Sequence, residues 1–135
     1  MNPSATRRAD QSGAAPSSAG TVIVWVLALL CGLFFLGHAY YKLSASEQMI
    51  AAFSVWGYSA TFMVGIAVLE AVCGLALMVP RLSTWAAVLL SIEMLGAVYT
   101  ILSTGIGMLV LPLVTLAVLA IVGWRRRPQA LGLRG

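Results

Sequence analysis

The sequence predicts an all-α integral membrane protein: a four-helix bundle, with a short amphipathic helix at the membrane surface between the first and second spans. Of the 135 residues, 61% are hydrophobic and 9% are charged, whereas a soluble domain carries about 25% charged residues. The apolar residues gather in four runs, close to the ~20 residues that a helix needs to cross a hydrocarbon core of ~30 Å. Lipid is therefore expected to cover a surface that is too apolar for water.

The boundaries of the elements follow from these runs and from the polar segments between them. Residues 1–20 are rich in Ser, Ala, Gly and Pro and are expected to form a disordered cytoplasmic tail. The run that follows is longer than the roughly 7–15 residues of a cleavable signal, so we expect an uncleaved signal anchor. The membrane domain is expected at 21–124, with spans at about 21–41, 60–79, 84–102 and 108–124. Residues 80–83 are expected to form a tight turn, and residues 125–135 a basic cytoplasmic tail.

The segment between the first two spans predicts more structure than a loop. Ser44 and Glu47 have the S-x-x-E spacing of a capping box, and apolar residues then recur at helical spacing up to Trp56. Gly57 is placed to end such a helix. We interpret the segment as an amphipathic helix lying on the outer face of the membrane. The alternative is an ordered loop whose aromatic side chains pack on the bundle.

The positive charges flank the apolar runs, which indicates orientation rather than nucleic-acid binding. Arg7 and Arg8 precede the first run, residues 125–127 are all arginine after the last one, and Arg81 lies in the expected turn. An even number of spans puts these charges on one side, so both termini are expected in the cytoplasm. Cys31 and Cys73 lie inside apolar runs without a CxxC pair and are interpreted as small buried hydrophobic residues.

Two acids inside the second and third spans are the most informative residues for function. A carboxylate at the bilayer centre costs roughly 2.5–3.5 kcal/mol, so Glu70 and Glu93 are expected to face protein rather than lipid. They are equally far from the middle of the expected turn, which predicts the same depth in an antiparallel hairpin. The functional interpretation is a site that exchanges protons or hydrogen-bonds a quinone. The structural interpretation is a pair of interhelical hydrogen-bonding groups.

Other polar side chains extend the candidate site. His38, at the outer end of the first span, is either a proton relay or a hydrogen-bonded structural group. Tyr99 in the third span either bonds within the bundle or anchors its outer boundary. Lys42 and Trp56 are interpreted as interfacial, with the ammonium group in the headgroups or beside Glu47. A single histidine excludes bis-histidine haem within one chain, and no catalytic triad, nucleotide loop or metal-ligand cluster is present in the sequence.

Several stretches within residues 25–105 resemble the DoxX-like family of small four-helix membrane proteins. They read GHAYYKL at 37–43, FSVWGY at 53–58, GIAVLEAVCGLALMVPR at 65–81, WAA at 85–87 and MLGA at 94–97. The family often has proline where this chain has Ser59. The resemblance implies four helices and a membrane-embedded acid at Glu70, and the expected location of the protein is the inner membrane of a bacterium. In some members it also implies an association with quinone-linked sulfur oxidation or oxidative-stress complexes. Glu93 is argued from this sequence alone.

Three functions compete at this point. The first is a non-catalytic accessory or structural subunit of a membrane complex, with a redox complex as the specific case; its partners are lipid and other membrane subunits. The second is a quinone-interacting oxidoreductase subunit that uses Glu70 and Glu93. The third is a proton-coupled transporter of small molecules, which a membrane-embedded glutamate alone favours. No catalytic residue is assigned, and quinone is the one cofactor that the sequence suggests.

Overall fold

A computed structural model describes residues 18–133, which form five helices and contain no strand. The all-α prediction is therefore confirmed. The helices are α2 (Ser18–Ser44), α3 (Ser46–Val55), α4 (Ala60–Met78), α5 (Pro80–Thr104) and α6 (Val110–Ala130). Predictions for residues 1–17 and 134–135 lie outside the described residues. Helix α2 begins at Ser18 and α6 continues to Ala130, so residues 18–20 and 125–130, which were expected to belong to the tails, are helical.

Three of these helices, α2, α4 and α5, are long and apolar enough to cross a membrane. Helix α6 is apolar up to Trp124, but any 18 consecutive residues within its bounds include the three arginines at 125–127. The chain thus has several helices that are apolar enough to span a membrane, whereas the fourth span stays a prediction.

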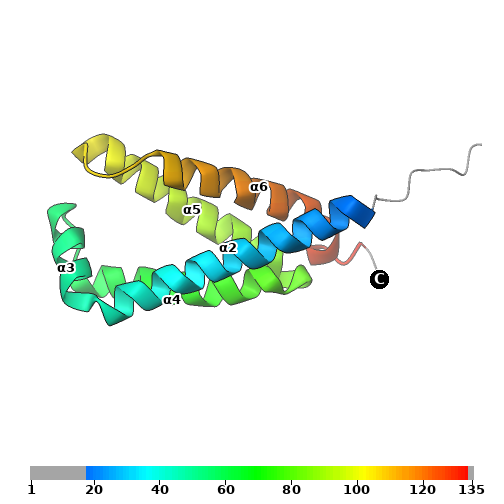
Figure 1. Ribbon diagram of the computed structural model, residues 1–135, viewed down its shortest axis with the longest axis horizontal. Coiled ribbons are helices and arrows are strands. Elements are labelled where there is room, and N and C mark those ends of the chain that lie inside the picture. Colours follow the sequence, from blue (N-terminus) through cyan, green and yellow to red (C-terminus); the bar gives the residue numbers. More distant parts are fainter. Residues whose placement is uncertain (1–17, 134–135) are drawn as a thin grey trace, which may run out of the picture.

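The long helices pack as two pairs, α2 with α4 and α5 with α6. The pairs converge where α4 passes into α5 and diverge toward the opposite end, where α3 lies (Figure 1). One buried core joins them near the convergent end, with residues from all four long helices, including Phe35 of α2, Leu77 of α4, Leu90 of α5 and Leu119 of α6. The free cysteines Cys31 and Cys73 are both buried in this core.

The α2–α4 pair is held together at a crossing of two glycines. A Cβ atom on Gly32 would lie 2.7 Å from the carbonyl oxygen of Gly74, and a Cβ on Gly74 would lie 3.0 Å from that of Gly32. Any larger residue would push the backbones apart, so the missing side chains set the distance between these helices. This crossing fixes the register in which the polar residues of α2 and α4 meet.

The connection from α4 to α5 differs from the predicted turn at residues 80–83. Only Val79 separates the two helices, and it has an extended conformation. Pro80 begins α5, because proline at the first helical position needs no N–H partner and already has a helical φ. Glu70 therefore lies nine residues before the connecting residue and Glu93 fourteen residues after it, so the equal spacing assumed from the sequence is not kept.

Helix α3 forms where the sequence predicted a helix, although its start differs. Its N-cap is Ala45, without a side-chain cap, and the Ser44 hydroxyl donates instead to the carbonyl of Tyr41. The capping-box interpretation is therefore wrong, because α2 continues through Ser44 and uses it in its own last turn. The C-terminus is as expected: Gly57 has φ 84°, and the amides of Gly57 and Tyr58 close a Schellman motif on Ser54 and Phe53. Its position at a membrane surface stays a prediction.

Candidate functional site

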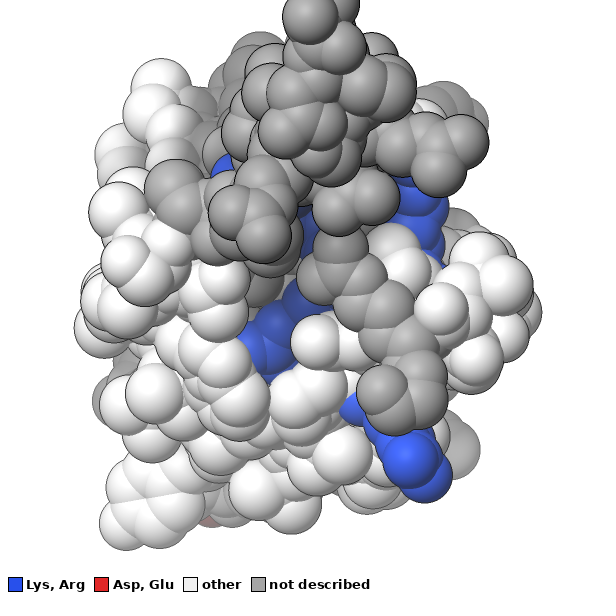
Figure 2. Space-filling view, turned by 90° about the vertical axis from the view of Figure 1, so that its right-hand side faces the viewer, with Lys and Arg blue, Asp and Glu red and all other residues white. Residues whose placement is uncertain are grey.

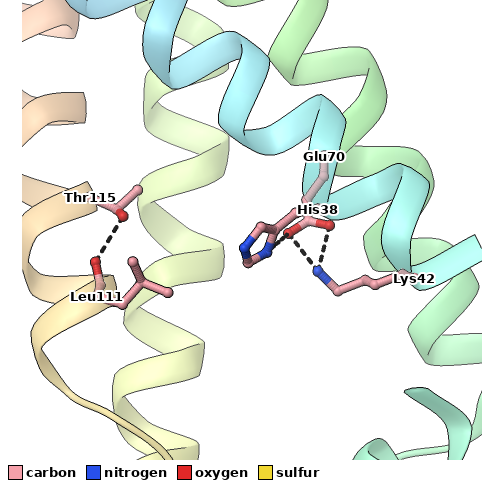
Figure 3. Close-up of polar contacts among 5 residues, drawn as sticks. All are labelled: His38, Lys42, Glu70, Leu111 and Thr115. Carbon is pink, nitrogen blue, oxygen red and sulfur yellow. Dashed lines mark hydrogen bonds and ion pairs between the residues drawn. The ribbon is translucent and has the colours of Figure 1, made fainter. Parts of the chain in front are cut away.

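An ion pair inside the α2–α4 interface is the centre of the candidate site (Figure 3). The Lys42 ammonium donates to both carboxylate oxygens of Glu70, at Nζ–Oε1 2.7 Å and Nζ–Oε2 2.6 Å. Lys42 is 7% exposed and Glu70 1% exposed, so water screens the pair very little. Each charge is expensive inside a bilayer by itself, and the two-point contact offsets that cost for both.

Helix geometry explains why these two side chains meet. In the antiparallel α2–α4 pair, Lys42 is ten residues and Glu70 four residues from the Gly32–Gly74 crossing, on the same side of it. Their Cα atoms are therefore offset by ~9 Å along the helices, at ~1.5 Å per residue. Side chains on a helix lean toward its N-terminus, so the long lysine chain leans back along α2 toward Glu70.

His38 lies one turn before Lys42 on the same face of α2 and forms the accessible edge of the site. Its Nδ1 is 3.9 Å from Glu70 Oε1, and its side chain is 44% exposed while Glu70 is enclosed. The imidazole lies 4.4 Å, centroid to centroid, from the Phe34 ring. His38 and Phe34 thus present a polar and an apolar group beside the buried carboxylate.

Glu93 of α5 completes the group of ionisable side chains. It lies near enough to interact electrostatically with both Glu70 and Lys42. Its Oε2 is buried without a hydrogen-bond partner, and within residues 18–133 no basic side chain forms an ion pair with it. We call His38, Lys42, Glu70 and Glu93 the polar cluster. One lysine faces two acids there, so the cluster contains a carboxyl oxygen that is not already bonded.

Two other predicted residues lie outside the polar cluster. Tyr99 is 71% exposed on the outer face of α5, so the structure does not bring it to the glutamates. Trp56 ends α3 and packs on Phe53 at 5.5 Å between ring centroids. The nearby Tyr58 hydroxyl shares a hydrogen bond of 2.6 Å with Thr100 Oγ1, which ties the start of α4 to α5.

The pairing of Lys42 with Glu70 was missed in the sequence, where Lys42 was interpreted as interfacial or paired with Glu47. A signal for it exists, since Lys42 continues the buried stripe of α2 at spacings of three and four residues. The buried residues of that stripe are Val24, Ala28, Cys31, Gly32, Phe35, Ala39 and Lys42. A lysine on a buried stripe needs a buried acid, and α4 supplies one on its own buried face.

Comparison with known proteins identifies one family. The model of a family described as DoxX-like matches residues 26–123, which is most of the chain. Comparison with curated proteins found no match. Comparison with solved structures found none either.

Proposed function

Because this chain belongs to the DoxX-like family, we propose that it is an accessory subunit of a membrane redox complex and that its polar cluster binds a quinone-class ligand. The observation that supports this proposal is the buried Lys42–Glu70 pair beside a second acid, Glu93, whose Oε2 has no partner. Ionisable groups inside membrane spans are costly and mark ligand or proton pathways more often than they serve structure alone.

The ion pair gives the cluster a fixed frame. Both oxygens of Glu70 are bonded to Lys42, so these two residues join α2 to α4, and a ligand that bonded Glu70 would compete with the ammonium group. Glu93 and His38 are more available to a ligand. Oε2 of Glu93 has no hydrogen-bond partner, and the side chain of His38 is 44% exposed. In this proposal Glu93 and His38 hydrogen-bond the ligand. Lys42 and Glu70 hold the surrounding helices in place.

A quinone matches these groups in chemical class. Its ring is flat and apolar, which suits the face of Phe34 beside His38. Its carbonyl oxygens accept hydrogen bonds, and they take up protons when a redox partner supplies electrons. Glu93 and His38 are side chains that can donate and regain a proton. The electrons come from the partner subunit, and this chain contributes binding and proton exchange.

The proposal includes a topology with four spans. In it α6 is the fourth span and its terminal arginines reach into the headgroup region, as long basic side chains do at helix ends. The arginines of α5 and α6 then lie on the cytoplasmic side of a bacterial inner membrane, with both termini, and α3 lies on the outer face. A fluorescent protein fused to the C-terminus should fold and fluoresce. A second reporter enzyme, one that is active only outside the cytoplasm, should be inactive when it is fused to the C-terminus. Activity of that fusion would overturn this topology.

Binding of a short-chain quinone analogue to the purified chain in detergent tests the site directly. Glu93→Gln and His38→Gln should each weaken binding about 10- to 100-fold, the loss expected for one hydrogen bond to a charged or proton-exchanging group. Glu47→Gln, on exposed α3, is the matched control and should leave the affinity unchanged. Affinities for both cluster variants within twofold of the wild type would rule out this site. Affinity purification from native membranes tests the complex, and a chain isolated without other subunits would count against that half of the proposal.

A further inference from the structure

Arg126 is buried at the convergent end of the bundle, where the sequence suggested only a basic tail. It is 3% exposed. Its Nη1 donates to the carbonyl oxygen of Leu77 at 3.0 Å and to Ser83 Oγ at 3.2 Å. Its guanidinium carbon lies 4.5 Å from the centroid of the Trp25 ring. One side chain of α6 thus contacts α2, α4 and α5 together.

The charge of Arg126 has no counter-charge among residues 18–133. Its three contacts are a carbonyl, a hydroxyl and an aromatic ring, and its Nη2 is buried without a hydrogen-bond partner. The acids of the described segment are Glu47, Glu70 and Glu93, and none forms an ion pair with it. A buried cation without an anion is costly, so this site favours an anion from beyond residues 18–133.

This end of the molecule lies at a membrane face. Helices α4 and α5 are both candidate spans and are joined here by a single residue, Val79, so their connection must emerge at the surface of the bilayer. Arg81 near the start of α5 and Arg125 and Arg127 near the end of α6 are exposed around Arg126. Figure 2 shows basic side chains in blue on this face, and they are arginines, because the one lysine of the sequence, Lys42, lies in the last turn of α2 at the other end of the molecule.

We propose that this face binds the phosphodiester headgroup of an anionic phospholipid, with Arg126 as the residue that makes the binding specific. The exposed Arg125 and Arg127 meet the headgroup, and Arg127 is itself held 3.6 Å above the ring of Trp124. Because Nη2 is enclosed, Arg126 acts through space: a bound phosphate supplies the missing negative charge near a buried guanidinium. Basic pockets between membrane-spanning helices are known to bind such headgroups. The inference is independent of the polar cluster.

The test compares lipid binding by matched variants of two neighbouring arginines. The full-length protein in neutral detergent is titrated with phosphatidylglycerol or phosphatidylcholine, and bound lipid is counted by native mass spectrometry. The wild type should prefer phosphatidylglycerol. Arg125→Met removes one exposed charge and should weaken that binding about fivefold or less, the effect of one basic residue near an anionic surface. Arg126→Met removes the buried charge and should weaken it about tenfold or more.

Each alternative outcome is decisive. Equal losses in the two methionine variants would mean a non-specific basic surface, and equal binding of the two lipids by the wild type would mean no headgroup site. Thermal unfolding of the protein is also measured with either inorganic phosphate or phosphatidylglycerol added. If phosphate raises the midpoint temperature of unfolding as much as phosphatidylglycerol does, the ligand is a free anion and the lipid proposal is wrong. Should Arg126→Met fail to fold, Arg126→Lys keeps the charge and is expected to stay within fivefold of the wild type. A larger loss there would show that charge is not what the lipid recognises.

Discussion

Breaking the Lys42–Glu70 ion pair tests the central structural claim. Lys42→Met keeps the length of the side chain and removes its charge, which leaves the Glu70 carboxylate buried without its partner. Removing one partner of a buried pair costs about 3–5 kcal/mol. The upper part of this range applies here, because Lys42 and Glu70 are 7% and 1% exposed and the lysine bonds both oxygens. We expect Glu70→Met to cost less, since Glu93 lies near enough to interact with the ammonium group that remains.

The double variant Lys42→Met/Glu70→Met separates the contribution of the ion pair to stability from that of the packing of the two side chains. Two apolar side chains of similar volume need no counter-charge, and such replacements are often neutral or stabilising. The double variant should therefore be more stable than either single variant, by about 2 kcal/mol or more. Glu47→Met is the control, because this exposed α3 acid was the alternative partner of Lys42 in the sequence. It should change stability by less than about 0.5 kcal/mol.

Equilibrium unfolding in mixed detergent micelles, titrated with sodium dodecyl sulfate and followed by circular dichroism, gives the four free energies of the cycle. Additive effects of the two single substitutions would show that Lys42 and Glu70 do not interact. The ion pair would then not hold the polar cluster in place. A cost below about 1 kcal/mol for each single variant would have the same meaning, because a pair this buried has no water to replace the lost partner.

Two further predictions use the same unfolding assay. Gly32→Ala should destabilise the protein by about 1–3 kcal/mol, because its Cβ would lie 2.7 Å from a backbone oxygen of α4. Gly37→Ala is the control and should stabilise by about 0.5–1 kcal/mol, because no atom lies within 4 Å of its added Cβ. Equal effects of the two substitutions would contradict the close crossing of α2 and α4. Tyr58→Phe should cost about 0.5–1.5 kcal/mol through the lost hydrogen bond to α5. Tyr99→Phe should cause no measurable loss of stability, because Tyr99 is exposed. A larger loss for Tyr99→Phe than for Tyr58→Phe would contradict the hydrogen bond assigned to Tyr58.

The helices were predictable where local chemistry fixes their ends. Helix α4 was expected at 60–79 and is found at Ala60–Met78, since the Ser59 hydroxyl accepts from the amide of Phe62 at one end and Pro80 follows the other. The connection to α5 was not predictable in the same way. Leu77 O, near the end of α4, accepts bonds from Ser83 Oγ and from Arg126, which is 49 residues away. A carbonyl satisfied by a distant residue leaves no local pattern in the sequence.

In the candidate site, too, some features could be predicted from the sequence and others depend on contacts between distant residues. The cost of a charge in a membrane identified Glu70 and Glu93 as inward-facing candidates, and Glu70 is among the most buried residues. It did not identify the partner, because a lysine near a helix end can reach the headgroups as readily as the interior. The register of α2 against α4 decides between these, and two glycines set that register.

The bonding of Glu70 limits which acid can exchange a proton freely. A proton on Glu70 would remove the charge that Lys42 binds, so exchange there would loosen the α2–α4 interface. Exchange at Glu93 breaks no ion pair among residues 18–133, since its Oε2 has no partner to lose. Ligand binding and stability should therefore respond differently: Glu93→Gln should lower affinity with little loss of stability, and Glu70→Gln should lower both. A Glu93→Gln variant as unstable as Glu70→Gln would mean that both acids hold the bundle together, which leaves no free carboxyl group for a ligand.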